Sequence, residues 1–270
     1  MEKINLSVQR SFSDLITVTI NFMKQEFVPF IRAFAVIGFP LILLMLFFMK
    51  DLLMGAFDMS LHPEAYYEVN NFGDTMLRTL FTSLFGMLLM MWVQLFAISY
   101  LRVYWDHYQA GIEERITVIE VFRVMLRKFG MYLVWSVFCG LVVFIGFLFL
   151  FVPGIYIGIS FTFGSYLLIL RDNGLGKIIT ESMAMVKGNW WKTFGFILVM
   201  YLLVGFWPTC LAFLHVLDDV LGFHGEIPNI YEITFSLLLS YLGQYTLYTV
   251  LFVGVGCFFS CSKRWNIRLC

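Results

Sequence analysis

Few side chains that could do chemistry lie inside the long apolar stretches of this chain. The deep polar residues are Gln94 and Gln244, with several tyrosines near the second glutamine. Tyr241, Gln244 and Tyr248 are spaced by three and four residues, which places them on one face of a helix. These three residues and Gln94 are the candidate lining of a polar groove for a lipid headgroup or a small solute. The favoured interpretation is interhelical hydrogen bonding, worth about 0.6 kcal/mol for each bond in a membrane bundle.

Three histidines, His62, His215 and His224, lie in or beside acidic segments. Imidazole and carboxylate groups together suit zinc or another divalent ion. The spacing His215-x-x-Asp218-Asp219 matches no established ligand motif, so solvated loop residues are the preferred interpretation. The chain also lacks a phosphate-binding loop, a nucleophile elbow and a basic groove with alternating aromatics. We therefore expect no enzymatic activity, no cofactor and no nucleic-acid partner.

The composition is that of a membrane protein. Of 270 residues, 60% are hydrophobic and 13% charged, against roughly 45–50% apolar and about 25% charged residues in soluble domains. The apolar runs are continuous, which favours helices over a barrel. The predicted fold is all-α and polytopic, with six transmembrane helices in three hairpins and the lipid bilayer as the surroundings. The six expected spans are residues 27–49, 80–101, 130–151, 155–170, 194–216 and 233–260.

The distribution of basic residues predicts the orientation. Of the 18 Lys and Arg residues, only Lys50 and Arg78 fall on the segments that would face outward when the N-terminus is inside. Because basic residues accumulate on the cytoplasmic side, we expect both termini in the cytoplasm. The setting that we expect is the bacterial inner membrane.

An amphipathic stretch precedes each hairpin, and two of these stretches begin with a helix-capping pattern. The patterns are Ser11 with Asp14 and Thr117 with Glu120. Each such helix is expected to lie in the headgroup layer or under the bundle. The single membrane domain 1–270 is thus divided into an amphipathic helix (1–26), a first hairpin (27–101, with the outer loop 50–78), an inner linker, amphipathic helix and second hairpin (102–170), an amphipathic helix and third hairpin (171–261) and a cytoplasmic tail (262–270).

A proline-glycine turn and a later Val-Lys-Gly-Asn-Trp-Trp sequence form the most specific motif. Its positions are Pro153, Gly154, Lys187, Gly188, Asn189, Trp190 and Trp191. With these positions, residues 116–205 resemble bacterial six-helix integral membrane proteins, the superfamily that includes the membrane domain attached to some glycerophosphodiester phosphodiesterases and its stand-alone relatives. The resemblance implies the architecture and the location. It implies no catalytic residue, since the phosphodiesterase activity of the named members resides in a separate soluble domain. The sequence departs from the pattern at Arg171-Asp172, where relatives often have an acidic residue after the fourth span.

Three functions are compatible with these patterns. The first is a non-enzymatic scaffold that recruits a cytoplasmic or membrane protein partner through its basic inner face. The second is a transporter or lipid-handling protein that moves an amphipathic molecule between helices, and the third is a membrane enzyme with a metal on its outer face. A rich surface pattern around an interior with few chemical groups favours the scaffold.

Overall fold

The computed structural model describes residues 12–45, 47, 72–149, 151–171, 174–188, 190–221 and 230–261, and every regular element in these ranges is a helix. After the first helix the chain bends and continues as a helical segment, Phe39–Met45. The helices are α1 (Phe12–Ile37), α3 (Phe72–Ala110), α4 (Val118–Phe149), α5 (Phe151–Arg171), α6 (Leu175–Val186), α7 (Trp190–Leu221) and α8 (Ile230–Cys261).

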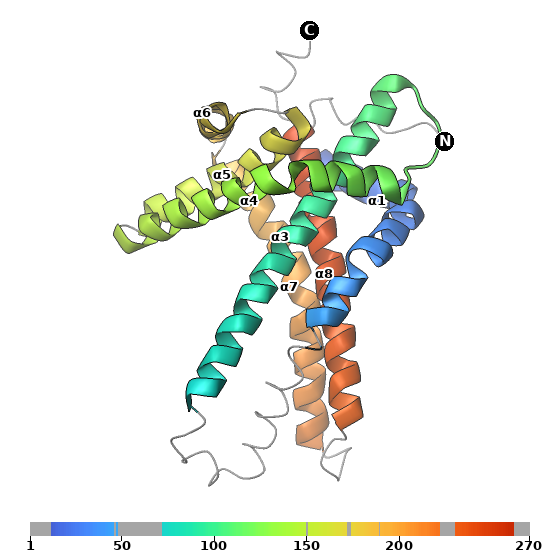
Figure 1. Cartoon of the computed structure of the whole chain (residues 1–270), viewed down its shortest axis with the longest axis vertical. Coiled ribbons are helices and arrows are strands. Elements are labelled where there is room, and N and C mark those ends of the chain that lie inside the picture. Colours follow the sequence, from blue (N-terminus) through green and yellow to red (C-terminus); the bar gives the residue numbers. More distant parts are fainter. Residues whose placement is uncertain are drawn as a thin grey trace.

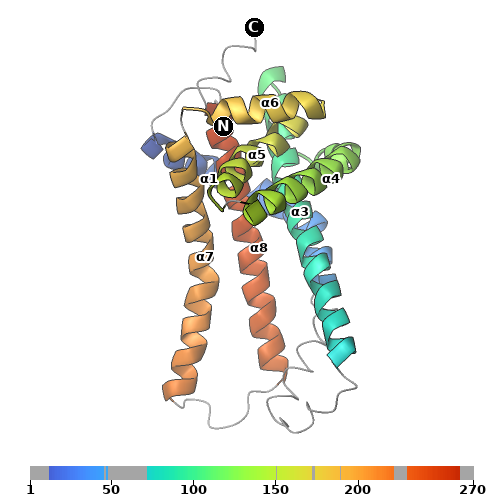
Figure 2. The ribbon, with the colours of Figure 1, turned by 90° about the vertical axis from the view of Figure 1, so that its left-hand side faces the viewer.

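The helices form a bundle with a hairpin laid across one end of it. Helices α3, α7 and α8 run along the long axis of the molecule, and α8 contacts both α3 and α7 (Figures 1 and 2). The antiparallel pair α4 and α5 lies across this axis and projects to one side, with α6 packed against α5 (Figure 1). The core sits where α1, α3, α5 and α8 cross.

Three helices are long and apolar enough to cross a membrane: Met76–Ala110, Val118–Leu148 and Pro153–Arg171. Two bent pairs pass the same criterion as combined elements, which gives up to five candidate spans within the described residues. The pairs are Thr17–Ile37 with Phe39–Met45, bent by 44°, and Leu175–Val186 with Trp190–Phe206, bent by 95°. The chain is therefore an all-helical protein with the apolar helices of a membrane protein.

The helix α4 starts with the capping pattern seen in the sequence. The Thr117 N–H donates to the Glu120 carboxylate at 2.9 Å, and the Glu120 N–H donates to the Thr117 hydroxyl at 3.4 Å. These reciprocal bonds satisfy two backbone donors that a helix N-terminus otherwise leaves open. From there α4 runs unbroken to Phe149.

The second amphipathic stretch and the following apolar segment are therefore one helix, where the sequence suggested two. In the same way α1 continues through Pro29 to Ile37. The third amphipathic stretch forms a separate short helix, α6. Gly188 has a positive φ of 86° in the turn before α7, a conformation that side chains other than glycine rarely adopt, so this glycine favours the break between the two helices.

Close backbone approach holds the α4–α5 hairpin together. A Cβ on Gly154, in the first turn of α5, would lie 3.0 Å from the Phe147 backbone nitrogen. The ring of Trp135 on α4 packs directly on Gly164 of α5, where any Cβ would overlap it. Small residues at such positions let helices pack tightly where no hydrophobic effect drives them together.

Two polar contacts fix the buried end of α5 in the bundle. The Arg102 guanidinium on α3 donates to the carbonyls of Ile169 and Leu170 in the last turn of α5, where helical carbonyls lack partners. The Tyr166 hydroxyl donates to the Phe252 carbonyl of α8 at 2.6 Å. The crossing of α3, α5 and α8 is thus defined by hydrogen bonds as well as by packing.

Candidate functional site

Two residues of the candidate polar groove, Gln94 and Tyr248, make contacts between helices. Gln94, half-buried on α3, accepts a hydrogen bond from the Tyr132 hydroxyl of α4 at 2.8 Å. Tyr248 packs edge-on against Tyr201 of α7, with ring centroids 6.4 Å apart. Among the described residues, neither Gln244 nor Tyr248 forms a hydrogen bond with Gln94. The side chain of Tyr241 lies outside the described part, and the groove stays a prediction.

The two halves of the sequence motif lie on elements that contact each other, through Tyr156 two residues after Gly154. Pro153 and Gly154 lie in the first turn of α5, while Lys187 and Gly188 form the turn between α6 and α7. Asn189 lies outside the described residues.

The contact between the two halves is aromatic. Tyr156 of α5 stacks on Trp190 of α7 at a centroid distance of 6.0 Å, and Trp190 stacks on Phe194 at 5.2 Å. Trp191 meets Trp190 edge-on and is 77% exposed. The motif therefore joins the hairpin to the start of α7, which is a structural role for its aromatic positions.

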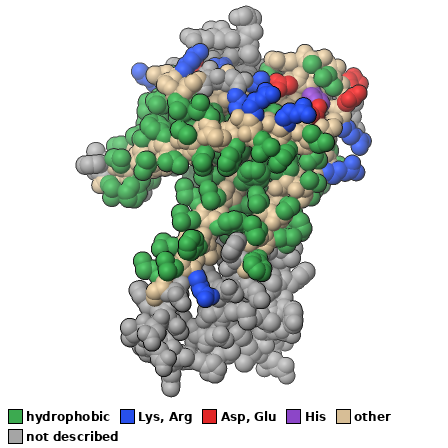
Figure 3. Space-filling view, in the orientation of Figure 1, with side chains coloured by type: hydrophobic (Ala, Val, Ile, Leu, Met, Phe, Trp, Pro, Cys, Tyr) green, Lys and Arg blue, Asp and Glu red, His purple; other side chains and the backbone are tan. Residues whose placement is uncertain are grey.

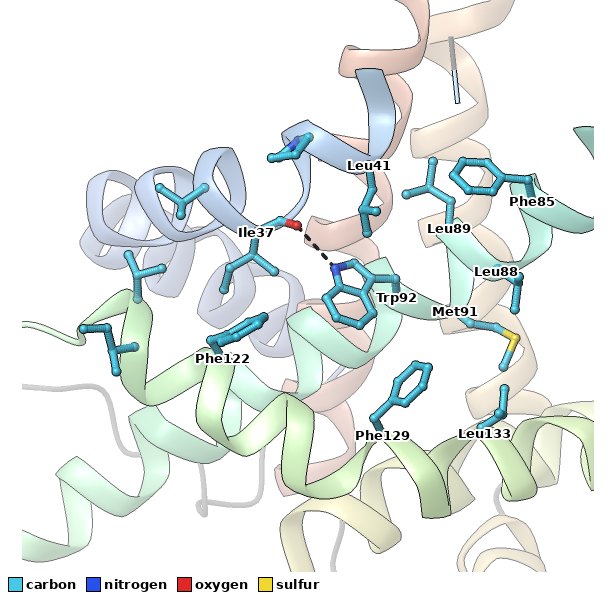
Figure 4. A pocket seen from close by; sticks show the side chains of 14 residues that line it. Ile37, Leu41, Phe85, Leu88, Leu89, Met91, Trp92, Phe122, Phe129 and Leu133 are labelled. Atoms are coloured by element: carbon cyan, nitrogen blue, oxygen red, sulfur yellow. Dashed lines mark hydrogen bonds between the residues drawn. The ribbon is translucent and has the colours of Figure 1, made fainter. Parts of the chain in front are cut away.

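The most developed site lies at the bend after α1. Pro40 has no N–H to donate to the preceding turn, and the Leu41 N–H bonds to the Gly38 carbonyl at 3.2 Å instead of reaching Ile37. The Ile37 carbonyl accepts instead from the Trp92 indole N–H of α3, at 3.3 Å. Figure 4 shows this bond at the centre of the site. The tryptophan thus fixes α3 against the bend.

A cavity of about 700 Å³ surrounds this contact, between the bend, α3 and the first half of α4. This volume is within the range of about 300–1,000 Å³ that is usual for ligand sites. Figure 4 shows its lining side chains converging from the three elements. The lining residues are Val36, Ile37, Pro40, Leu41, Phe85, Leu88, Leu89, Met91, Trp92, Val118, Ile119, Phe122, Phe129 and Leu133.

The cavity is apolar inside and open at its side. Every lining side chain is hydrocarbon or thioether except the Trp92 indole, and the indole N–H already has its acceptor. Several lining residues are strongly exposed: Val36 by 63%, Leu88 by 52% and Ile119 by 69%. An open apolar hollow with no unsatisfied polar group accepts an alkyl chain and offers nothing to a sugar or an ion.

A buried carboxyl group on α1 was not predicted from the sequence. Glu26 of α1 is only 8% exposed, and the hydroxyl of the fully buried Tyr100 donates to it at 2.9 Å. The available signal was spacing: Glu26 lies four residues from both Phe22 and Phe30, on the buried stripe of α1. An ionisable residue on the apolar face of a helix is a candidate for burial.

Within the described residues, no three His, Cys, Asp or Glu side chains lie close enough together to hold a metal ion. His62 and His224 lie outside the described residues, as does the side chain of His215. The proposed outer metal site thus falls on parts for which the structure gives no geometry.

Comparisons with protein-family models, curated proteins and solved structures find no match to this chain. The resemblance to the membrane domain of glycerophosphodiester phosphodiesterases is therefore still a prediction from the motif residues.

Proposed function

We propose that this protein is a non-enzymatic membrane protein that binds a membrane lipid, with an acyl chain of the lipid in the cavity between the α1 bend, α3 and α4. The observation that carries the proposal is the lining: a hollow of about 700 Å³ whose single polar group, the Trp92 indole N–H, is already bonded. Of the functions weighed from the sequence, this is the lipid-handling alternative.

The energetics favour a chain over water in this hollow. Water in the cavity finds no polar partner, whereas an acyl chain from the bilayer makes dispersion contacts with the hydrocarbon lining. The exposed lining residues Val36, Leu88 and Ile119 leave a lateral opening. A lipid can enter through this opening from the surrounding bilayer without crossing a polar region.

Blocking the cavity tests the proposal. Leu88→Trp places a large side chain at the opening, while Leu84→Trp is the matched control one turn earlier on α3, since Leu84 is equally exposed and does not line the cavity. The lipid retained by each purified protein is measured by native mass spectrometry. We expect one lipid for each wild-type and Leu84→Trp chain, and roughly tenfold weaker retention by Leu88→Trp, a change of about 1.4 kcal/mol.

Equal retention by the three proteins would refute the proposal. Wild type could instead be a lipid-free dimer that Leu88→Trp dissociates. In that case the occupant of the cavity is a second copy of the chain, not a lipid. The masses of the intact complexes distinguish these results.

The α4–α5 hairpin, which lies across the axis of α3, α7 and α8, departs from the six parallel spans in three hairpins expected from the sequence (Figures 1 and 2). The membrane architecture that we propose for this function therefore keeps the bent pair at α1 together with α3, α7 and α8 as spans, with both termini in the cytoplasm, in the inner membrane of a bacterium. The helical ranges of α7 and α8 support it, because they include the expected spans 194–216 and 233–260. With this orientation the cavity opens toward the cytoplasmic half of the bilayer.

Recruitment of a protein partner is the second candidate function. It is favoured by α6, which packs on the outside of α5 and carries the exposed residues Lys177, Met183 and Lys187 on or beside it. Affinity purification in mild detergent tests it. A stoichiometric partner that is lost with Lys177→Glu and Lys187→Glu supports recruitment, and the absence of any stoichiometric partner contradicts it.

A further inference from the structure

We propose that the lipid held in the cavity has an anionic headgroup, bound by Arg32 of α1 and Arg123 of α4. This inference rests on the proposed lipid-binding function and specifies its ligand. The carrying observation is that two exposed arginines each lie one helical turn from a lining residue of an otherwise apolar site.

The two arginines border the cavity by helical geometry. Arg32 precedes Val36 by one turn of α1, and Arg123 follows Ile119 by one turn of α4. Residues four apart are neighbours on a helix surface, and both Val36 and Ile119 line the cavity. Arginine side chains are long enough to cover apolar surface while their guanidinium groups extend beyond it.

Both guanidinium groups are available to a ligand. Arg32 and Arg123 are exposed, and among the described residues neither has a carboxylate within salt-bridge distance. The nearby Glu120 carboxylate is engaged by Thr117 and lies 3.5 Å from the His107 imidazole.

Arg115 also lies near the start of α4, directly after Glu113 and Glu114. Two acids adjoin it in the sequence, and the inference does not depend on it. Arg32 and Arg123 each lie one turn from a lining residue and form no ion pair within the described residues.

The opposite side of the cavity is apolar, which orients the ligand. The lining continues along α3 from Trp92 toward Phe85, and further along the same helix Leu84, Phe81 and Leu80 are all exposed. In the space-filling view, Lys and Arg side chains gather toward one end of the molecule, and hydrophobic side chains cover the hairpin and the middle of the bundle (Figure 3). A ligand that is anionic at one end and hydrocarbon at the other matches this polarity.

Arginine suits this headgroup for a chemical reason. Its planar guanidinium donates two parallel hydrogen bonds to phosphate oxygens. Each basic residue near an anionic lipid surface strengthens the attraction roughly fivefold, so two would give about thirtyfold. A zwitterionic lipid offers the same phosphate oxygens, but its headgroup cation offsets the attraction, so the preference comes from the net charge of the headgroup.

A headgroup competition tests the inference. The purified protein is equilibrated with equal amounts of phosphatidylglycerol and phosphatidylcholine that carry identical acyl chains, and the bound lipid is identified by native mass spectrometry. We expect wild type to prefer the anionic lipid by about thirtyfold. In the double variant Arg32→Gln with Arg123→Gln, the preference falls close to one while the protein still holds a lipid.

Arg127→Gln is the matched control, because Arg127 is an exposed arginine one turn beyond Arg123 and follows no lining residue by a single turn. It should retain the wild-type preference. Equal binding of the two lipids to wild type, or an equal loss in Arg127→Gln and the double variant, would overturn the inference. Either result leaves the proposed function intact, whereas failure of wild type to retain any lipid removes the proposed function itself.

Discussion

The carboxylate of Glu26 lies among the apolar side chains of α1, and its hydrogen bond from Tyr100 connects α1 to α3. A buried polar group is costly unless it is hydrogen-bonded. Phe30 packs edge-on against the same tyrosine ring, with centroids 4.9 Å apart. The Tyr100 side chain therefore fills the space between the two helices and donates a hydrogen bond to the carboxylate.

Removing this hydroxyl should destabilise the protein. We expect Tyr100→Phe to lower the free energy of unfolding by about 1–3 kcal/mol, because it leaves a buried acceptor without its donor. Tyr108→Phe is the control on the same helix, since the Tyr108 hydroxyl has no hydrogen bond within the described residues. Thermal unfolding in detergent measures both. Equal stability of the two variants would show that the Glu26 contact contributes nothing.

At this scale the sequence predicted capping better than it predicted burial. Thr117 and Glu120 were identified from spacing alone, since a capping box is a local pattern within one turn. The partners of Gln94 and Glu26 come from other helices, and no local pattern contains that information. Hydrogen bonds such as Tyr132 to Gln94 depend on how helices cross, which a single sequence does not specify.

Among the helices, α8 shows how a glycine determines packing. Gly256 lies where Tyr166 of α5 and Leu101 of α3 approach the α8 backbone, and an added Cβ would lie 3.0 Å from the Tyr166 ring. The hydrogen bond from Tyr166 to the Phe252 carbonyl is made one turn away. The absent side chain therefore allows three helices to meet.

We expect Gly256→Ala to destabilise the fold by about 1–3 kcal/mol through overpacking. Gly195→Ala in α7 is the matched control, since its Cβ meets nothing within 4 Å. In a helix interior this control change is neutral or stabilising by up to about 1 kcal/mol. The midpoint of thermal unfolding is the measurement, and a Gly256→Ala midpoint at or above that of Gly195→Ala would contradict the packing argument.

The long apolar helices could be predicted from the sequence, and their crossings could not. Hydropathy predicted helical segments at 80–101 and 130–151, and α3 and α4 cover most of both ranges. The cavity was not predicted, because Leu88 and Ile119 have the same side-chain chemistry as residues that face lipid. Only the arrangement of the three helices around Trp92 separates a binding hollow from an ordinary apolar surface.

Considered as a whole, the molecule separates charge from hydrocarbon. Hydrophobic side chains cover the α4–α5 hairpin and the adjoining bundle, and Lys and Arg side chains gather toward the end that carries this hairpin (Figure 3). Because basic residues accumulate on the cytoplasmic side of membrane proteins, this end is expected to face the cytoplasm.

Site-directed labelling tests this orientation. In a background without the five native cysteines, Arg78→Cys and Lys187→Cys are treated with a membrane-impermeant maleimide in intact cells. We expect Arg78→Cys to react directly and Lys187→Cys to react only after permeabilisation, because Arg78 lies at the outer start of α3 in the proposed topology. Labelling of Lys187→Cys in intact cells would reverse the topology.

The length of α3 has a mechanical consequence. Its 39 residues extend about 58 Å at 1.5 Å per residue, nearly twice the roughly 30 Å hydrocarbon thickness of a bilayer. In a membrane, α3 therefore extends past the hydrocarbon layer without a break. Most of its residues from Val93 to Tyr104 are buried against other helices, so any tilt of its immersed portion must also move the helices that pack on this half.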